Sequence, residues 1–256
     1  MPVATTSKRQ FMDHLETLGI ESGMSIVVHS SMISFGIIEG GAQTALSCLL
    51  DRVGESGTLI APAFTFGLRE HDIFDPLTSE GTGTGELSEL IRTTSSSVRG
   101  AQPIHSYAAI GRNAQVVKLG DPNISFGTNS IFSHFLAADT FWLTLGCRFD
   151  RGATYIHQCE ALLEVPYREW LDLPRTRRND AQQIESVMIR YFGTRGDEDR
   201  AWSPYAVEKQ ISGNASCSSA LTAYGISRLM PTDILHNVTE QLITSDPEVL
   251  LVQPAN

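Results

Sequence analysis

The sequence predicts an α/β protein whose single domain is built on a mixed, partly parallel sheet flanked by helices. Helical and strand-like segments alternate through the first third of the chain, which is typical of parallel sheets with crossover helices. Hydrophobic residues make up 41% of the 256 residues, enough for one sizeable core. No internal repeat or linker-like stretch divides the sequence, so residues 1–256 are expected to form one domain.

Each element is predicted from local periodicity and from its boundaries. Phe11, Leu15 and Leu18 share one helical face after a Ser/Thr start, which indicates an N-terminal helix. Short apolar runs that end in polar loops indicate buried strands. The predicted helices cover 6–18, 42–53, 86–92, 181–192 and 232–244, and the predicted strands cover 24–28, 58–61, 143–145 and 249–252. A tight glycine-rich loop is expected at 34–41, and a long ordered loop at 66–86.

Charge and cysteine usage exclude several classes of function. The formal net charge of −10 disfavours non-specific binding to nucleic acid and would help to gather a cationic substrate, although solubility alone also explains it. Four widely spaced cysteines without a C-x-x-C pair indicate reduced thiols. Residues 1–9 are polar, and no apolar run approaches the roughly 18–20 residues of a membrane span. A cytoplasmic protein without a membrane partner is expected.

The segment V-V-H-S-S-M-I-S-F-G-I-I-E-G-G, residues 27–41, places a polar, glycine-rich loop after a predicted strand. Open α/β sheets bind ligands at such strand ends, where backbone N–H groups and hydroxyls can hold phosphate oxygens. The glycine spacing matches neither a dinucleotide fingerprint nor a P-loop. A phosphate cradle and a structural turn are both compatible with this segment. The G-T-G-T-G-E-L run at 81–87 is interpreted as a flexible loop that caps the next helix.

A second candidate site lies in A-T-Y-I-H-Q-C-E, residues 153–160. On a helix His157 and Glu160 share a face, with Thr154 one turn earlier. A carboxylate beside an imidazole fixes its tautomer and raises its basicity, as a general base requires. Cys159 is expected to point elsewhere and to pack. A lone histidine and carboxylate are too few to define a metal site, so none is predicted. A hydrogen-bonded core histidine is the alternative interpretation.

A third candidate is the pair His105 and Ser106, which stands just before the apolar run Y-A-A-I-G. A His-Ser dipeptide is weak evidence for nucleophilic chemistry, because the members of a triad meet in space and not in sequence. The local pattern alone favours a hydrogen-bonded turn.

Taken together, these segments resemble one known family. H-S-S-M-x-x-F-G-x-I-x-G-G, G-T-L-I-A-P-A-F-T-F, H-S-Y-A-A-I-G, S-F-G-T-N-S-I-F and T-x-x-H-x-x-E followed by V-P-Y-R occur in this order between about residues 12 and 170. Their content and order are similar to the aminoglycoside 3-N-acetyltransferase family, whose antibiotic N-acetyltransferase fold is distinct from the GNAT superfamily. The resemblance implies an acetyl-CoA-dependent N-acetyltransferase domain, no metal, a small-molecule amine as partner and a possible homodimer.

The resemblance also implies roles for individual residues. His157 would act as the general base that deprotonates the amine, and Glu160 would orient it and help to hold a cationic acceptor. Ser106 would lie near the thioester carbonyl and stabilise the developing oxyanion. Thr154 and His105 would contact the acceptor. The residues implied in CoA binding are His29, Ser30, Ser31, Phe35, Gly36 and Ser106.

Two departures from the family pattern fall where donor and acceptor should meet. Gln102 replaces the histidine of the family's His-Pro-x-x-Ser, and Ile131 replaces the proline of its F-G-x-x-S-P. The expected function is acetylation of an aminoglycoside-type antibiotic by direct transfer. The alternatives are acylation of a biosynthetic amine (a nucleotide-linked amino sugar or an amino phosphonate), a hydrolase that uses Ser106 or Cys159 with His157, and a binding protein without catalysis.

Overall fold

A seven-stranded mixed sheet forms the centre of the computed structural model, which describes residues 3–252. The three middle strands β8, β2 and β4 run parallel, and the pairs outside them are antiparallel. This arrangement confirms the predicted mixed, partly parallel sheet. In order across the sheet, the strands are β11 (Ser218–Leu221), β12 (Ile226–Pro231), β8 (Phe141–Leu145), β2 (Ser25–Ser30), β4 (Thr58–Pro62), β7 (Tyr107–Gly111) and β6 (Val98–Arg99).

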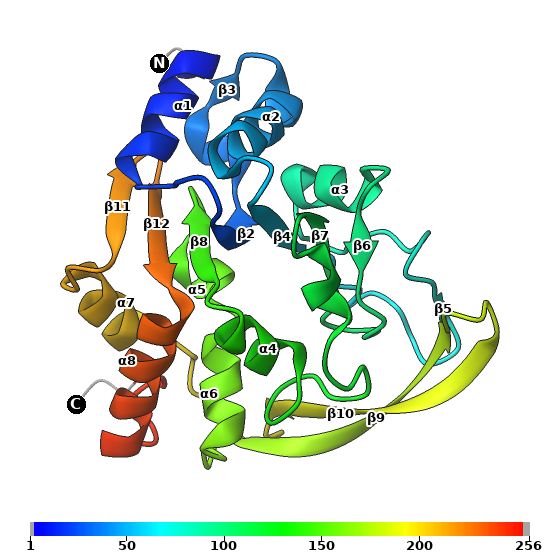
Figure 1. Cartoon of the computed structure of the whole chain (residues 1–256). Coiled ribbons are helices and arrows are strands. Elements are labelled where there is room, and N and C mark those ends of the chain that lie inside the picture. The colour runs from blue at the N-terminus through cyan, green and yellow to red at the C-terminus, as the bar shows by residue number, and fades with distance from the viewer. Residues whose placement is uncertain (1–2, 253–256) are drawn as a thin grey trace.

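Helices cover both faces of this sheet (Figure 1). Along β2, Ile26 and Val28 belong to one core cluster and Val27 to the other, because successive side chains of a strand point to opposite faces. The first face packs against α1 (Lys8–Thr17), α2 (Gly41–Val53) and α3 (Glu86–Thr93). The second packs against α4 (Ile131–Ala137), α6 (Ile156–Leu162), α7 (Tyr205–Ser212) and α8 (Thr232–Ser245).

A long hairpin extends away from the central sheet (Figure 1). Its strands β9 (Arg168–Arg178) and β10 (Ile184–Thr194) pair antiparallel over their full length, and β5 (Ile73–Phe74) pairs with β9. The helix predicted over 181–192 is therefore wrong. Its β-branched and aromatic residues favour a strand once β9 supplies a continuous ladder of cross-strand partners.

The remaining predictions are mostly confirmed. The helices predicted at 6–18, 42–53, 86–92 and 232–244 and the strands at 24–28, 58–61 and 143–145 are present. The strand predicted at 249–252 is wrong, because Leu251 makes only an isolated bridge with Trp202. Shorter elements are β1 (Thr5–Thr6), β3 (Ile37–Ile38), the 3₁₀ turns η1 (Met32–Phe35) and η2 (Ala114–Lys118), and α5 (Phe149–Gly152). Within residues 3–252, no helix combines the length and apolarity that a bilayer crossing requires.

Candidate functional site

A cavity of about 650 Å³ opens at the edge of the sheet where the parallel strands end. His29 and Ser30 reach it at the end of β2, Pro62 at the end of β4, and Cys147 just after β8. The loops that follow the carboxyl ends of parallel strands form the usual ligand site of open α/β sheets. The wall consists of His29, Ser30, Ser31, Pro62, Phe64, Phe66, Thr82, Gly83, Thr84, His105, Cys147, Arg148, Asp150, Arg151, Thr154, His157 and Tyr191.

His157 lies on the first turn of α6 and borders this cavity, with 23% of its side chain exposed. Its Nδ1 forms a short hydrogen bond with Oε2 of Glu160, as the i,i+3 spacing on a helix allows. An ionised carboxylate can only accept, so this bond requires the proton on Nδ1, and Arg168 Nη2, which lies 3.2 Å from the same nitrogen, then makes no hydrogen bond to it. Nε2 is the ring nitrogen left for a ligand. The predicted pairing of these two residues is present in the structure.

Glu160 is fully buried behind His157 and does not border the cavity. Its Oε1 accepts hydrogen bonds from Tyr167 Oη at 2.6 Å and Trp202 Nε1 at 2.9 Å. Arg168 Nε lies 2.9 Å from its Oε2. With these three partners and His157, the carboxylate has no surface left for the cationic acceptor that the sequence-based hypothesis assigned to it.

The environment fixes the charge of both members of the pair. Burial lowers the pKa of His157, although the negative charge of Glu160 works in the opposite direction. Burial alone would raise the pKa of Glu160, but His157, Arg168 and the Tyr167 hydroxyl together bring it down to about 2. At neutral pH the imidazole is therefore neutral and the carboxylate is ionised.

Two further histidines border the cavity in buried, apolar surroundings. Burial lowers the pKa of His29 and of His105 to about 3, so both are neutral at physiological pH. His29 stacks on Trp142 at 5.2 Å between ring centroids. His105 stacks on Tyr191 at 5.7 Å, and its buried Nδ1 has no hydrogen-bond partner in residues 3–252.

Gln102, which replaces the family histidine, positions the turn that carries His105. The side chain is buried, and its Oε1 accepts hydrogen bonds from the backbone N–H groups of Ile104, at 2.6 Å, and of His105. Its Nε2 donates to Ser125 Oγ at 2.9 Å. The substitution thus leaves a buried amide with its hydrogen bonds satisfied.

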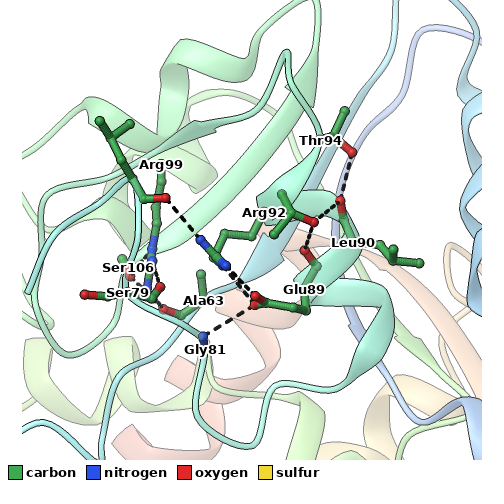
Figure 2. A network of polar contacts seen from close by, with 11 residues as sticks. Ala63, Ser79, Gly81, Glu89, Leu90, Arg92, Thr94, Arg99 and Ser106 are labelled. Carbon is green, nitrogen blue, oxygen red and sulfur yellow. Dashed lines mark hydrogen bonds and ion pairs between the residues drawn. The ribbon is translucent and has the colours of Figure 1, made fainter.

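Ser106 is buried and does not line this cavity, but together with His105 it lines a smaller one of about 150 Å³. Its hydroxyl donates to the carbonyl of Ala63 at 2.8 Å and accepts from Arg99 Nε at 3.1 Å. Figure 2 shows that the buried Arg99 guanidinium also reaches the carbonyl of Ser79, so that it connects the loop before Thr82 to the end of β4. Ser106 therefore belongs to a network that supports the wall.

The other predicted residues divide between the wall and the core. Ser30, Ser31 and Thr154 border the cavity. Phe35 is buried and packs on Phe11 with ring centroids 5.0 Å apart, and Gly36 follows it outside the wall.

Cys159 points toward α8, as its spacing from His157 suggested. Its Sγ lies 3.5 Å from His236 Nδ1, and burial raises the pKa of the thiol. Neither Cys159 nor Ser106 is placed as a nucleophile beside His157.

Several site residues were missed by the sequence analysis. Asp150 and Arg151 lie on α5 and Arg148 immediately precedes it, shortly after β8. A charged run that follows a buried strand was a usable signal. Trp202, whose ring centroid lies 4.9 Å from that of His157, left no signal because it is 42 residues from Glu160 in the chain. Tyr191 was missed because residues 181–192 were predicted as a helix.

Comparison with known sequences identifies the family. A family model described as aminoglycoside 3-N-acetyltransferase matches residues 27–212. The chain is 29% identical over 189 residues to aminoglycoside N(3)-acetyltransferase VII of Streptomyces paromomycinus, covering 66% of this chain and 65% of that protein, so it spans just under two thirds of this relative. It is 27% identical over 233 residues to aminoglycoside N(3)-acetyltransferase IX of Micromonospora chalcea, covering 84% and 81%.

Solved structures have the same fold. The structure of AAC-IIIb with CoASH superposes with a TM-score of 0.82 at 21% identity and covers 99% of this chain and 100% of that one. The YokD protein of Bacillus subtilis gives a TM-score of 0.81 at 19% identity and covers 93% of each chain. The family resemblance of the sequence motifs is confirmed: the chain belongs to the aminoglycoside 3-N-acetyltransferase family.

Proposed function

We propose that this protein transfers an acetyl group from acetyl-CoA directly to a primary amine, with His157 as the general base. The observation that carries the proposal is the pair in which buried Glu160 engages Nδ1 of His157, so that Nε2 is available in the cavity. An alkylammonium is not a nucleophile until it loses a proton. A neutral imidazole in fixed orientation can take that proton, and the ionised Glu160 stabilises the imidazolium that results.

The wall of the cavity fits the proposed donor. Ser30, Ser31, Thr82 and Thr84 offer hydroxyl groups, and Arg148 and Arg151 place cationic side chains at the same cavity. Guanidinium and hydroxyl groups are suitable partners for the phosphates of CoA. When bound, acetyl-CoA supplies the acyl group as a thioester. A serine or cysteine nucleophile beside His157 is not needed for this reaction.

Two classes of acceptor are compatible with this chemistry. The names of the relatives favour an aminoglycoside. A biosynthetic amine, such as a nucleotide-linked amino sugar or an amino phosphonate, would use the same base and the same donor.

Acetyl-CoA binding and a histidine substitution test the proposal. Acetyl-CoA is expected to raise the melting temperature, because a ligand that binds only the folded state stabilises it. The His157→Ala variant should lose roughly 10²- to 10⁴-fold in the rate of thiol release, as expected when a general base is removed, while it retains the acetyl-CoA-induced thermal shift. His71→Ala, at an exposed position, is the control. A His157→Ala variant that keeps its turnover would disprove the role of the base.

A further inference from the structure

The acyl transfer proposed above needs a hydrogen-bond donor for the thioester carbonyl oxygen, which becomes negatively charged in the transition state. The family resemblance assigned that role to Ser106. Its hydroxyl instead donates to the carbonyl of Ala63 at 2.8 Å and accepts from Arg99 Nε, and Ser106 does not line the main cavity, the one of about 650 Å³ that His157 borders. The neighbouring His105 does line it.

The imidazole of His105 lies on the side of the main cavity. Phe64 and Phe66 meet it edge-on with ring centroids 5.1 and 5.2 Å away, and Tyr191 stacks on it at 5.7 Å. All three of these aromatic residues line the main cavity, and none of them lines the smaller cavity of about 150 Å³ that Ser106 borders. The ring is thus held by its neighbours in the wall of the main cavity.

Only one nitrogen of this ring is available to a ligand. Nδ1 is enclosed by protein atoms and has no hydrogen-bond partner within residues 3–252. A neutral imidazole carries its proton on one of its two nitrogens, and a buried N–H group without an acceptor is rare in protein interiors. The proton therefore belongs on Nε2, and the ring offers this nitrogen to a ligand as a donor.

Gln102 fixes the backbone that carries this ring. Its Oε1 accepts hydrogen bonds from the N–H groups of Ile104, at 2.6 Å, and of His105, and its Nε2 donates to Ser125 Oγ. A donor that is already oriented needs no reorganisation when charge develops beside it. Gln102 is thus a positioning residue for His105.

We propose that His105 donates a hydrogen bond from Nε2 to the thioester carbonyl oxygen and stabilises the oxyanion of the acyl transfer. The inference rests on the proposed function. Once His157 has taken the proton of the amine, the amine nitrogen bonds to the carbonyl carbon and the π electron pair moves to the oxygen beside His105. The C–S bond then breaks, the sulfur keeps the electron pair, and the proton held by His157 neutralises the thiolate.

The two imidazoles keep separate roles during this reaction. Burial, and to a smaller extent the charge of protonated His157, lower the pKa of His105 to about 3. His105 therefore stays neutral when His157 becomes an imidazolium, and it keeps its single N–H group. Its enclosed Nδ1 cannot reach the amine, so His105 does not replace His157 as the base. A neutral imidazole is an effective donor to a carbonyl oxygen.

The tautomer of His105 can be measured without turnover. Long-range hydrogen–nitrogen correlation spectra of the wild-type protein, with the signals assigned through single His→Gln variants, should place the proton of His105 on Nε2 and that of His157 on Nδ1 at neutral pH. A proton on Nδ1 of His105 would overturn the proposal.

Two substitutions of His105 test its role in the transition state. His105→Phe removes the donor and keeps an aromatic ring, whereas His105→Gln keeps a side-chain N–H donor. The phenylalanine variant should lose roughly 10²- to 10³-fold in kcat for thiol release, with its KM for acetyl-CoA close to the wild-type value, because the lost interaction belongs to the transition state. The glutamine variant should have a kcat at least tenfold higher than the phenylalanine variant. A wild-type kcat in His105→Phe, or equal kcat in the two variants, would overturn the proposal.

The pH profile separates a donor from a base. The acidic limb of kcat/KM should keep its position in His105→Gln, because the substitution removes a neutral group, and loss of that limb would overturn the proposal. Kanamycin, UDP-glucosamine and aminoethylphosphonate are the probe amines for these assays. Absence of thiol release by the wild type with all three would refute the proposed function, whereas a wild type that turns over beside an equally active His105→Phe variant would refute this inference alone.

Discussion

At the scale of single residues, the site depends on how Glu160 is buried. The carboxylate is ionised without contact with water because Tyr167, Trp202, Arg168 and His157 all engage it. Such a group orients the imidazole by one hydrogen bond and stabilises its protonated form by charge. The second effect is measurable, because the negative charge raises the pKa of His157.

Glu160→Gln should therefore move the acidic limb of the kcat/KM profile to lower pH. The neutral imidazole is the active form of a base, so activity rises with pH through the pKa of His157, and removal of the carboxylate charge lowers that pKa. The variant should also be less stable by about 3 kcal/mol, because Arg168 loses its buried partner. pH–rate profiles and urea titrations measure the two effects.

Tyr167→Phe is the matched control for that substitution. It removes one hydrogen bond to the same carboxylate but no charge, so the position of the acidic limb should stay close to that of the wild type. A Glu160→Gln profile that coincides with the wild-type profile would contradict the electrostatic role.

The spacing of His157 and Glu160 on one helical face was enough to predict that they pair. The residues that enclose Glu160 could be predicted from the sequence only in part. Tyr167 and Arg168 belong to the quoted V-P-Y-R segment, whereas Trp202 reaches the carboxylate through the tertiary fold alone. The hydrogen bond of Ser106 to Ala63 could not be predicted for a similar reason, since Ala63 lies 43 residues away at the end of the neighbouring β4.

At the scale of elements, the turn after β2 depends on a close approach at the end of β8. Gly146 has φ +63°, and a Cβ at this position would overlap Ser34 Oγ and lie 3.0 Å from the carbonyl oxygen of Ser31. Only glycine fits both the backbone conformation and the space. This contact holds the Ser31 end of the cavity wall against the sheet.

Gly146→Ala is expected to lower the melting temperature and to weaken the acetyl-CoA-induced thermal shift, because Ser31 must move. Gly41→Ala is a matched control: Gly41 also has φ +63°, but a Cβ there meets nothing within 4 Å. Both variants carry the backbone strain of about 1–2 kcal/mol. The difference in melting temperature between them therefore measures the effect of the steric overlap alone. Equal melting temperatures and equal shifts would show that the turn tolerates displacement.

The elements also show why sequence patterns predicted some parts of the fold better than others. Helices such as α1 and α8 and the central strands carry clear periodicity and were predicted correctly. In the 181–192 segment, Ile184, Val187, Met188 and Tyr191 recur at helical spacing, so periodicity alone could not distinguish a helix from a strand. The partner strand β9 decided the outcome.

At the scale of the whole molecule, the buried neutral histidines couple folding to pH. The folded-state pKa of His29 and of His105 is about 3, below the value near 6.5 of an unfolded chain. Between these values the unfolded state binds more protons, so stability falls as pH decreases through this range. Each histidine contributes a slope of about 1.4 kcal/mol per pH unit well below pH 6.5.

Urea titrations between pH 7 and pH 5 should show this loss in the free energy of unfolding. His105→Gln should reduce the slope of that free energy against pH. His71→Gln, at an exposed position, should leave the slope unchanged. A His105→Gln variant with the wild-type slope would contradict the assignment of the neutral buried state.

The whole chain carries a net charge of −10, yet the wall of the cavity is not acidic. The overall composition therefore did not predict the charge of the wall.

The β9–β10 hairpin reaches two parts of the site. The central sheet and α6 provide the strand ends and His157, and the hairpin strands contribute Tyr191 to the wall. Arg168, the first residue of β9, also lies 2.9 Å from Oε2 of Glu160. The hairpin therefore joins the wall of the cavity to the buried carboxylate behind it.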